Sequence, residues 1–295
     1  MNIVTIGEIL WDVFDSGDRL GGAPFNFSAH AARLGHHVCF VSGVGSDARG
    51  EKALEEMARL SVPSRYVRKA FDAATGVVTV TLTAAGEPSY VVHRPAAYDF
   101  PVLDAEDLRE LGNLQPAWIA YGTLAQTSPV VHAVTESLLA ALPQAGRFYD
   151  VNLRKGSEDP ALVERLLGEA TFVKLNEGEA ARLSGWFGLA GNSVEVFCQA
   201  VSSRFQLQGV CVTLGARGCA LRIDGEFARC AGYNVQVRDA VGAGDAFAAA
   251  LLHGIGNGWP LSRTGDFANR VGALVASRPG GIPDWSVAES LQLAL

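Results

Sequence analysis

Residues 239–247 read D-A-V-G-A-G-D-A-F, and three alanines and two leucines follow them. The small residues at 242–244 let an anion approach the backbone, and the alanine-rich run favours a helix that begins there. The first turn of a helix carries unpaired N–H groups and partial positive charge. The stretch therefore predicts an anion site of phosphate size, with the carboxylate of Asp245 in the same turn. The helix dipole alone also explains an isolated Asp here, so other parts of the chain must decide its role.

A second glycine-rich stretch lies near the N-terminus, where residues 21–26 read G-G-A-P-F-N. It also opens a run of small residues, and its proline suits the first turn of a helix. The two stretches, in this order and about two hundred residues apart, resemble the two signatures of the ribokinase and fructokinase (PfkB) family of carbohydrate kinases. The resemblance covers nearly the whole chain, and the pair is far more specific than either glycine motif alone.

The resemblance implies a ribokinase-like three-layer αβα sandwich with a mostly parallel sheet, in one kinase domain spanning residues 1–295. The pattern itself agrees from residue 104 onward, where helical and strand periods alternate as in βαβ units. Alternating residues at 75–83 and 89–92, separated by a turn at 85–87, predict a hairpin. With strands near Ile9 and Tyr66 it would form a small β-sheet lid, built from segments of about 10–20 and 64–99, that keeps water from the reaction.

Three residues near the N-terminus are the predicted sugar contacts. Asp12 follows the first strand, and ligands of open α/β sheets gather outside the carboxyl ends of strands. Gly22 allows a ligand close to the backbone, and Asn26 both donates and accepts hydrogen bonds. The family resemblance implies that all three bind sugar hydroxyls. On position alone, a turn carboxylate and an ordinary glycine turn with an exposed Asn explain them equally well.

Arginines supply the remaining predicted substrate contacts. Arg94 lies in a setting similar to that of an arginine in fructokinases and 2-keto-3-deoxygluconate kinases, and Tyr90, His93 and Tyr98 are further candidates from the lid. Arg154 ends the segment D-V-N-L-R, which resembles D-P-N-x-R of fructokinases with Val in place of Pro. Its fork of donors suits phosphate or a polar substrate group, although a loop arginine is usually directed to solvent.

Matches to the family's nucleotide motifs lie in the C-terminal half. N-x-x-E at 176–179 implies a carboxylate, Glu179, that holds Mg²⁺ through water, although the same residues satisfy a helix N-cap. T-L-G-x-x-G at 213–218 implies a phosphate-lining segment, and Asn269 an adenine neighbour. A monovalent cation such as K⁺ beside Asp239 is a weaker implication, because Ala240 replaces the usual Thr. The predicted nucleotide contacts are Lys174, Asn176, Thr213, Gly215, Gly218, Gly242, Gly244 and Asn269.

Phosphoryl transfer needs a positioned hydroxyl, a proton acceptor and positive potential around the moving phosphate. Asp245 is the predicted proton acceptor, and the backbone of Gly242, Ala243 and Gly244 the predicted catalytic anion site. The substrates would be ATP, with Mg²⁺, and fructose, since 21–26 and the segment G-T-L-A at 122–125 look more like fructokinases than ribokinases. A 2-keto-3-deoxygluconate kinase or another sugar kinase of the family is the alternative, and a non-catalytic sugar or nucleotide sensor is the alternative of a different class.

The glycine motif G-V-G-S-D-A at 43–48 matches a dinucleotide fingerprint between a strand and a helix. An oxidoreductase built on it lacks the acidic residue expected about twenty positions later, where Pro63, Ser64 and Arg65 stand. We therefore interpret the motif as part of the kinase scaffold.

Composition limits the partners. Apolar residues make up 48%, charged residues 19%, and the net charge is -7, which argues for a globular protein with no nucleic-acid partner. No apolar run approaches the ~18 residues of a membrane span, and no basic residues precede the first apolar segment, so we expect a cytoplasmic protein without a membrane partner.

The five widely spaced cysteines indicate neither a zinc site nor a disulfide framework. An exposed lid edge would suit a homodimer.

Overall fold

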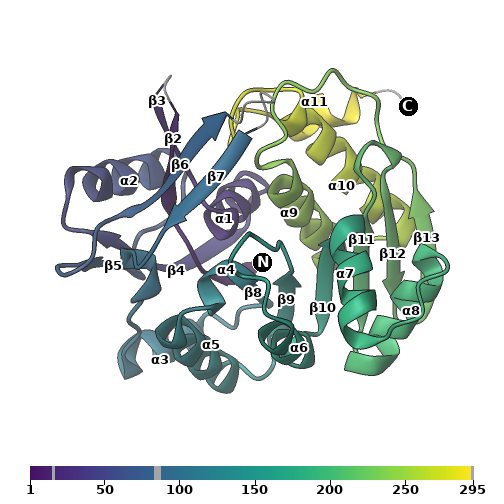
Figure 1. The fold of residues 1–295 in the computed structure, drawn as a ribbon, viewed down its shortest axis with the longest axis horizontal. Coiled ribbons are helices and arrows are strands. Elements are labelled where there is room, and N and C mark those ends of the chain that lie inside the picture. Colours follow the sequence, from purple (N-terminus) through teal and green to yellow (C-terminus); the bar gives the residue numbers. More distant parts are fainter. Residues whose placement is uncertain (15–16, 83–87, 294–295) are drawn as a thin grey trace.

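A nine-stranded sheet forms the centre of the protein in the computed structural model, which describes residues 1–14, 17–82 and 88–293 (Figure 1). Seven neighbouring strands are parallel, and two antiparallel strands extend one edge. In spatial order they are β13 (Glu226–Cys230), β12 (Cys219–Ile223), β11 (Gly209–Thr213), β10 (Phe172–Asn176), β9 (Gly146–Asp150), β8 (Trp118–Gly122), β1 (Asn2–Ile6), β4 (His37–Gly45) and β5 (Val67–Ala70).

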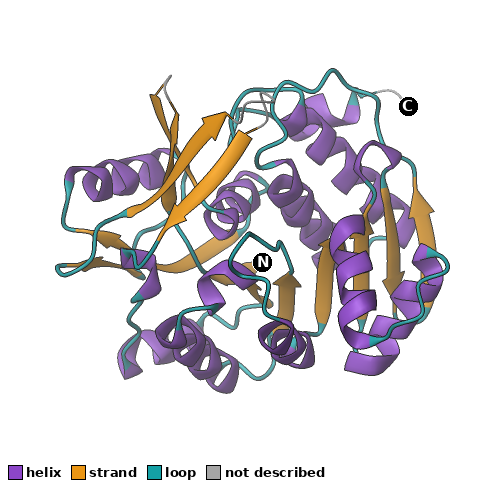
Figure 2. Ribbon diagram, viewed as in Figure 1, coloured by secondary structure: helices purple, strands orange, loops and turns teal. Residues whose placement is uncertain are grey.

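Helices cover both faces of this sheet, which confirms the three-layer αβα architecture (Figure 2). The central strands are apolar on both faces, as expected for strands of a parallel sheet that is buried twice. One face packs on α1 (Ala23–Arg33), α2 (Ala48–Arg59), α9 (Ala243–Gly256) and α10 (Leu261–Ala276). The other packs on α3 (Ala105–Asn113), α4 (Thr123–Gln126), α5 (Pro129–Ala141), α6 (Pro160–Glu169), α7 (Glu177–Phe187) and α8 (Val194–Phe205).

The remaining helical turns are short: α11 (Val287–Leu291) and two 3₁₀ turns, η1 (Ala97–Asp99) and η2 (Gly215–Arg217). Among the described residues, no helix combines the length and the apolar character that crossing a membrane requires. All five cysteines are buried free thiols.

The second sheet has four strands in the order β3 (Gly17–Gly21), β2 (Leu10–Phe14), β6 (Gly76–Leu82) and β7 (Pro88–His93). It projects from the main sheet beside α1 and corresponds to the predicted lid (Figure 1). The turn predicted at 85–87 lies outside the described residues. The strand predicted near Tyr66 is not part of this sheet, because β5 pairs with β4 and extends the edge of the main sheet.

The glycine motif at 43–48 serves the scaffold. Strand β4 continues through Gly45, and Asp47 caps α2 by accepting a hydrogen bond from the backbone N–H of Gly50. Asp47 also accepts bonds from the backbone and the hydroxyl of Thr75, which ties this turn to the start of the second sheet. A side chain at Gly43 would collide with the backbone of Ala97, so the glycine is required for packing.

Chain order in the main sheet reverses beside β1, since β4 follows on one side and β8 on the other. Such a reversal opens a crevice at the carboxyl ends of the strands, where open α/β sheets bind ligands. The N-termini of α1 and α9, from opposite ends of the chain, lie side by side at this crevice (Figure 1).

Candidate active site

The two glycine-rich stretches meet through a single hydrogen bond. Asn26, in the first turn of α1, donates from Nδ2 to Oδ2 of Asp245, in the first turn of α9, over 2.8 Å. Both side chains are buried, with 3% and 9% of each residue exposed. The structure thus brings together residues that are 219 positions apart in sequence.

Glycine is required at both helix starts. Gly22 is the N-cap of α1 with φ 106°, and a Cβ there would lie 2.5 Å from the carbonyl oxygen of Glu8. Gly242 is the N-cap of α9 with φ 75°, and a Cβ there would collide with the backbone of Gly281. Positive φ and close backbone contact both exclude a side chain. The two helix starts therefore pack closely against the backbone of Glu8, after β1, and of Gly281.

A cavity of about 470 Å³ opens between these helix starts and the lid. The register of the lid places Asp12 of β2 beside Val78 of β6, and Val78 beside Val92 of β7. All three face the cavity as one row across the sheet, so the lid contributes one carboxylate and an apolar surface. Polar and charged residues that line the cavity are Glu8, Asp12, Asn26, Asn152, Arg154, Lys174, Asn176, Thr213 and Asp245.

Three carboxyl groups in this cavity have raised pKa values. Burial raises the pKa of Glu8 to about 7, and those of Asp12 and Asp245 to about 6. The guanidinium of Arg154 opposes each of these shifts, as does the ammonium group of Lys174 for Asp245. Carboxyl groups with pKa values this close to neutrality are typical of sites where protons move or polar ligands bind.

A second cavity of about 300 Å³ adjoins the first, and both are lined by Thr213, Ala240 and Gly244. The 3₁₀ turn after β11 lines it with Gly215 and Gly218. Asn269 of α10 forms part of the opposite wall, and its Nδ2 donates to the carbonyl oxygen of Ala231 over 2.9 Å. The first turn of α9 therefore lies where the two cavities join.

Lys174 is the buried cation at this junction. Its Nζ donates to both carboxylate oxygens of Asp150, at 3.1 and 2.9 Å. Burial alone would lower the pKa of Lys174, but the charge and hydrogen bond of Asp150, together with the charges of Asp245 and Glu179, outweigh burial and the pKa is raised. A Cβ built on Gly244 would lie 3.4 Å from this Nζ, so the ammonium group lies directly beside the start of α9. An anion bound at this helix start would contact both the ammonium group of Lys174 and the partial positive charge of the first turn of α9.

A family model described as pfkB family carbohydrate kinase matches residues 7–288, which covers both glycine-rich helix starts and both cavities. The chain belongs to the pfkB family of carbohydrate kinases. A fructokinase from Klebsiella pneumoniae is 30% identical over 312 residues, covering 99% of this chain and 99% of the relative.

Solved structures of carbohydrate kinases share the fold. A fructokinase from Xylella fastidiosa with bound ATP has a TM-score of 0.86 at 25% identity, covering 98% of this chain and 97% of that one. A 2-dehydro-3-deoxygluconokinase from Thermotoga maritima has a TM-score of 0.85 at 19% identity, covering 99% and 98%, which is a likeness of fold alone.

In this carbohydrate kinase Glu179 belongs to the support of the cavity rather than to its lining. Asn176 and Glu179 form a capping box at the start of α7, with Asn176 Oδ1 accepting from the N–H of Glu179 and Glu179 Oε2 from the N–H of Asn176. The other oxygen of Glu179 accepts from the N–H of Leu153 over 2.8 Å. Glu179 therefore orients two segments that line the site, and a role with Mg²⁺ through water stays a prediction.

Asp239 holds the loop before α9 in place. Its Oδ1 accepts from the N–H of Val241, and its Oδ2 accepts from the N–H of Gly280 and from Arg19 of the lid. Donors from the loop, the 280–281 turn and the lid thus converge on this carboxylate, and a monovalent cation beside it stays a prediction. We therefore assign Asp239 to the connection between the loop, the 280–281 turn and the lid.

Arg94 does not line the cavity of about 470 Å³ between the helix starts and the lid, in contrast to the expectation that it contacts the substrate. Its guanidinium pairs with Asp99 and donates to the carbonyl oxygen of Leu124 over 2.9 Å and to Thr127, so its donors are used within the scaffold. His93 is exposed and contacts Thr79, while Tyr98 is fully buried beneath the lid. The side chain of Tyr90 lies outside the described residues.

Glu8 is the site residue that the sequence analysis did not select. It follows β1 directly, is 4% exposed, and its Oε2 is buried in the described structure without a hydrogen-bond partner. Asp12, four residues later, was selected on the same positional argument. The pattern G-E after the first buried strand is the only sequence signal for Glu8, and burial, which distinguishes it, depends on the tertiary structure.

Proposed function

We propose that this kinase transfers the γ-phosphoryl group of ATP to the 6-hydroxyl of fructose. The observation that carries the proposal is the carboxylate of Asp245 at the junction of the two cavities, held by Asn26 over 2.8 Å. One cavity suits a sugar and the other a nucleotide, so a carboxylate between them is within reach of both reacting groups.

The reaction follows from this arrangement. Asp245 accepts the proton of the sugar hydroxyl, the hydroxyl oxygen forms a bond to the γ-phosphorus, and the bond to the bridging oxygen of ADP breaks. The first N–H groups of α9, at Gly242 to Asp245, have no intrahelical acceptors and carry partial positive charge. They stabilise the charge on the moving phosphoryl group, together with Lys174 beside them.

The nucleotide occupies the second cavity in this proposal. Its phosphates lie along Thr213, Gly215 and Gly218 toward the start of α9, and its base lies near Asn269. Mg²⁺, when bound with ATP, neutralises phosphate charge. Glu179 fits a contact through water, because each of its oxygens retains a lone pair beyond the backbone bond that it accepts.

Charge in the first cavity favours a neutral sugar. Glu8, Asp12 and Asp245 face it, whereas Arg154 at its mouth is the lining cation that is free of an ion pair among the described residues. Hydroxyl groups can donate to the three carboxyls, while the carboxylate of a sugar acid would be repelled by them. The name fructokinase of the Klebsiella pneumoniae relative supports the same choice.

A 2-keto-3-deoxygluconate kinase is the second candidate, because Arg154 is an exposed guanidinium at the cavity mouth and could bind the acid group of that sugar. An ADP-release assay with ATP and Mg²⁺ over fructose, ribose, 2-keto-3-deoxygluconate and adenosine separates the candidates. Fructose should give the highest kcat/KM. Higher kcat/KM with the sugar acid would overturn the choice of substrate, and thermal stabilisation by ligands without any ADP would indicate a sensor. Replacing K⁺ by a bulky organic cation in the same assay tests the predicted cation requirement.

A further inference from the structure

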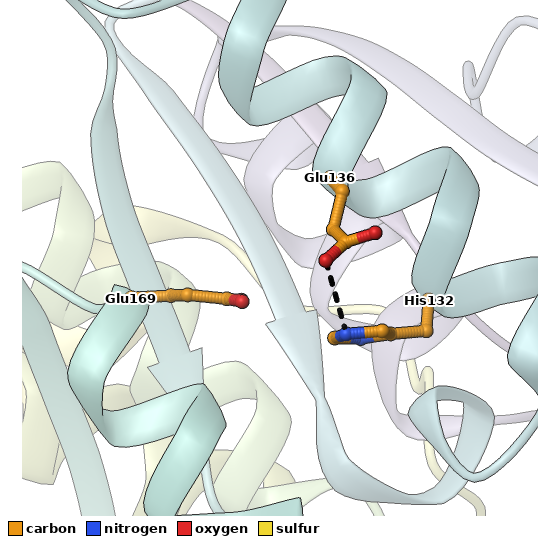
Figure 3. A group of neighbouring side chains, drawn as sticks. All are labelled: His132, Glu136 and Glu169. Carbon is orange, nitrogen blue, oxygen red and sulfur yellow. Dashed lines mark ion pairs between the residues drawn. The ribbon is translucent and has the colours of Figure 1, made fainter.

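Three potential metal ligands converge on the helical layer opposite α1 and α9. His132 and Glu136 lie one turn apart on α5, and Glu169 is the last residue of α6 (Figure 3). Their nearest ligand atoms all lie within 4.8 Å of one another. None of the three lines the sugar or the nucleotide cavity.

Buried hydrogen bonds fix the orientation of His132. The hydroxyl of Thr135 donates to the carbonyl oxygen of Val131, so it must accept the 2.8 Å bond from Nε2 of Gln126. The amide oxygen of Gln126 then faces Nδ1 of His132 at 3.3 Å, which makes Nδ1 the protonated nitrogen of the neutral ring. Metal-binding histidines are commonly held in this way by a hydrogen bond to the other nitrogen.

The remaining nitrogen, Nε2, therefore presents a lone pair to a carboxylate. It lies 3.6 Å from Oε1 of Glu136. Two ligands of a tetrahedral zinc ion, each about 2 Å from the metal, are separated by about 3.3 Å. The spacing of this pair is thus close to that of two ligands on one ion. A proton on Nε2 would also satisfy the pair, but it would leave the third side chain without a partner.

A proton on Nε2 of His132 would account for its contact with Glu136, but it would not pair the carboxylate of Glu169. Its Oε2 is buried and has no hydrogen-bond partner in the described structure. It lies at the C-terminus of α6, where the helix carbonyls already carry partial negative charge. Burial raises the pKa of Glu169; the charge of Glu136 acts in the same direction, whereas His132, Arg165 and Arg147 oppose it. A divalent cation would neutralise the two carboxylates.

We propose that His132, Glu136 and Glu169 form a binding site for a divalent transition-metal ion of the zinc class. An imidazole nitrogen favours zinc, nickel or copper over magnesium and calcium, which prefer oxygen ligands alone. Three protein ligands leave a fourth position for water, as in other three-ligand zinc sites.

Zinc titration of the chelator-treated, nucleotide-free kinase tests the proposal, in a buffer with excess Mg²⁺ to occupy weaker oxygen sites. Calorimetry should show one equivalent of zinc, and zinc should raise the melting temperature. His132→Gln and Glu169→Gln should each weaken zinc binding on the order of tenfold or more. Glu164→Gln is the matched control, since Glu164 lies on the same helix but pairs with Arg204.

Folding of the variants is checked by a cooperative thermal melt without zinc. The effect of zinc is then measured against each variant's own zinc-free melting temperature, because His132 and Glu169 are partly buried and their replacement can change stability by itself. Loss of zinc-dependent stabilisation in both ligand variants, with retention in Glu164→Gln, supports the site. Absence of zinc binding by the unsubstituted protein overturns it, as does binding that is equally tight in all variants.

Discussion

Glu8→Gln should make the ligand-free kinase more stable at alkaline pH and poorer at binding its sugar. The substitution keeps the shape of the side chain and removes an ionisable group that is 4% exposed, faces the sugar cavity and has an oxygen without a partner. Without ligand, such a buried charge costs stability. With ligand, the carboxylate that faces the cavity can accept a hydrogen bond from a sugar hydroxyl.

The magnitude follows from the pKa. Burial raises the pKa of Glu8 from 4.5 to about 7, a difference worth on the order of 3 kcal/mol at 1.36 kcal/mol per unit. Because the folded pKa is the higher one, the folded protein binds more protons than the unfolded chain between these values. The free energy of unfolding therefore falls as pH rises from about 4.5 to 7. Replacement by Gln removes this loss of stability at high pH. The gain is smaller by about 1 kcal/mol or more if the N–H groups of the new amide lack an acceptor.

Thermal melts of the ligand-free protein from pH 4.5 to 8 measure the effect. At the lower limit the two proteins should melt at similar temperatures, and at pH 8 the variant should melt up to about 5 °C higher, given the unfolding entropy of a chain this long. Glu164→Gln, a change at an exposed and paired carboxylate, is the control and should shift the melting temperature little.

Sugar kinetics complete the test. The KM for fructose should rise about tenfold or more in Glu8→Gln, because a hydrogen bond to a charged acceptor contributes roughly 1.5–3 kcal/mol. The KM for ATP should change little, since Glu8 lines the sugar cavity but not the nucleotide cavity. An unchanged pH dependence of stability together with an unchanged fructose KM would refute the reasoning.

Three further predictions concern the site and its scaffold. Asp245→Asn should lower kcat by roughly 10² to 10⁴, while calorimetry should show that the affinity for ATP is retained. In the unsubstituted enzyme, kcat should fall about tenfold per pH unit below about pH 6, because Asp245 then takes up a proton. A kcat that does not change between pH 5 and 7 would contradict the role of Asp245. Gly242→Ala should reduce both kcat and the melting temperature, because the added methyl group would collide with the backbone of Gly281. The control is Gly258→Ala, where φ is also positive, at 65°, but the surrounding space is open, so this variant should lose only a small part of its stability. Equal losses of stability in the two variants would argue against the contact with Gly281. Arg94→Gln should destabilise the fold by about 3 kcal/mol, because the buried carboxylate of Asp99 loses its charged partner. The KM for fructose should stay within about twofold of that of the unsubstituted enzyme. A large rise in this KM would show that Arg94 contacts the sugar.

The sequence was sufficient for the features that depend on local pattern. Both glycine-rich helix starts follow from small residues before helical runs. The αβα layers were implied by the family resemblance, with which the alternation of helical and strand periods from residue 104 onward agrees. The contact between Asn26 and Asp245 was predictable only through the family resemblance, because no local signal joins residues 219 positions apart.

Features that depend on burial or on long-range pairing were not predictable. Arg94 lies in a segment typical of a substrate contact, yet Asp99, five residues later, pairs with it. The edge position of β5 depends on β4 being free on that side, which the sequence around Tyr66 does not encode. Glu169 reaches His132 only because α5 and α6 pack on the same sheet face.

The lid strands β2 and β3 form an excursion of the chain between β1, which ends beside Glu8, and α1, which begins beside Asn26. A motion of the lid is therefore anchored at both ends by backbone that lines the sugar cavity. Strand β3 is also joined to the loop before α9 by the ion pair of Arg19 with Asp239, a partly exposed pair whose contribution is at most about 1 kcal/mol. An energy of this size changes the ratio of two conformations by less than about tenfold. We therefore expect that, in a sheet that opens and closes during turnover, the pair would favour the closed form without preventing release of the product.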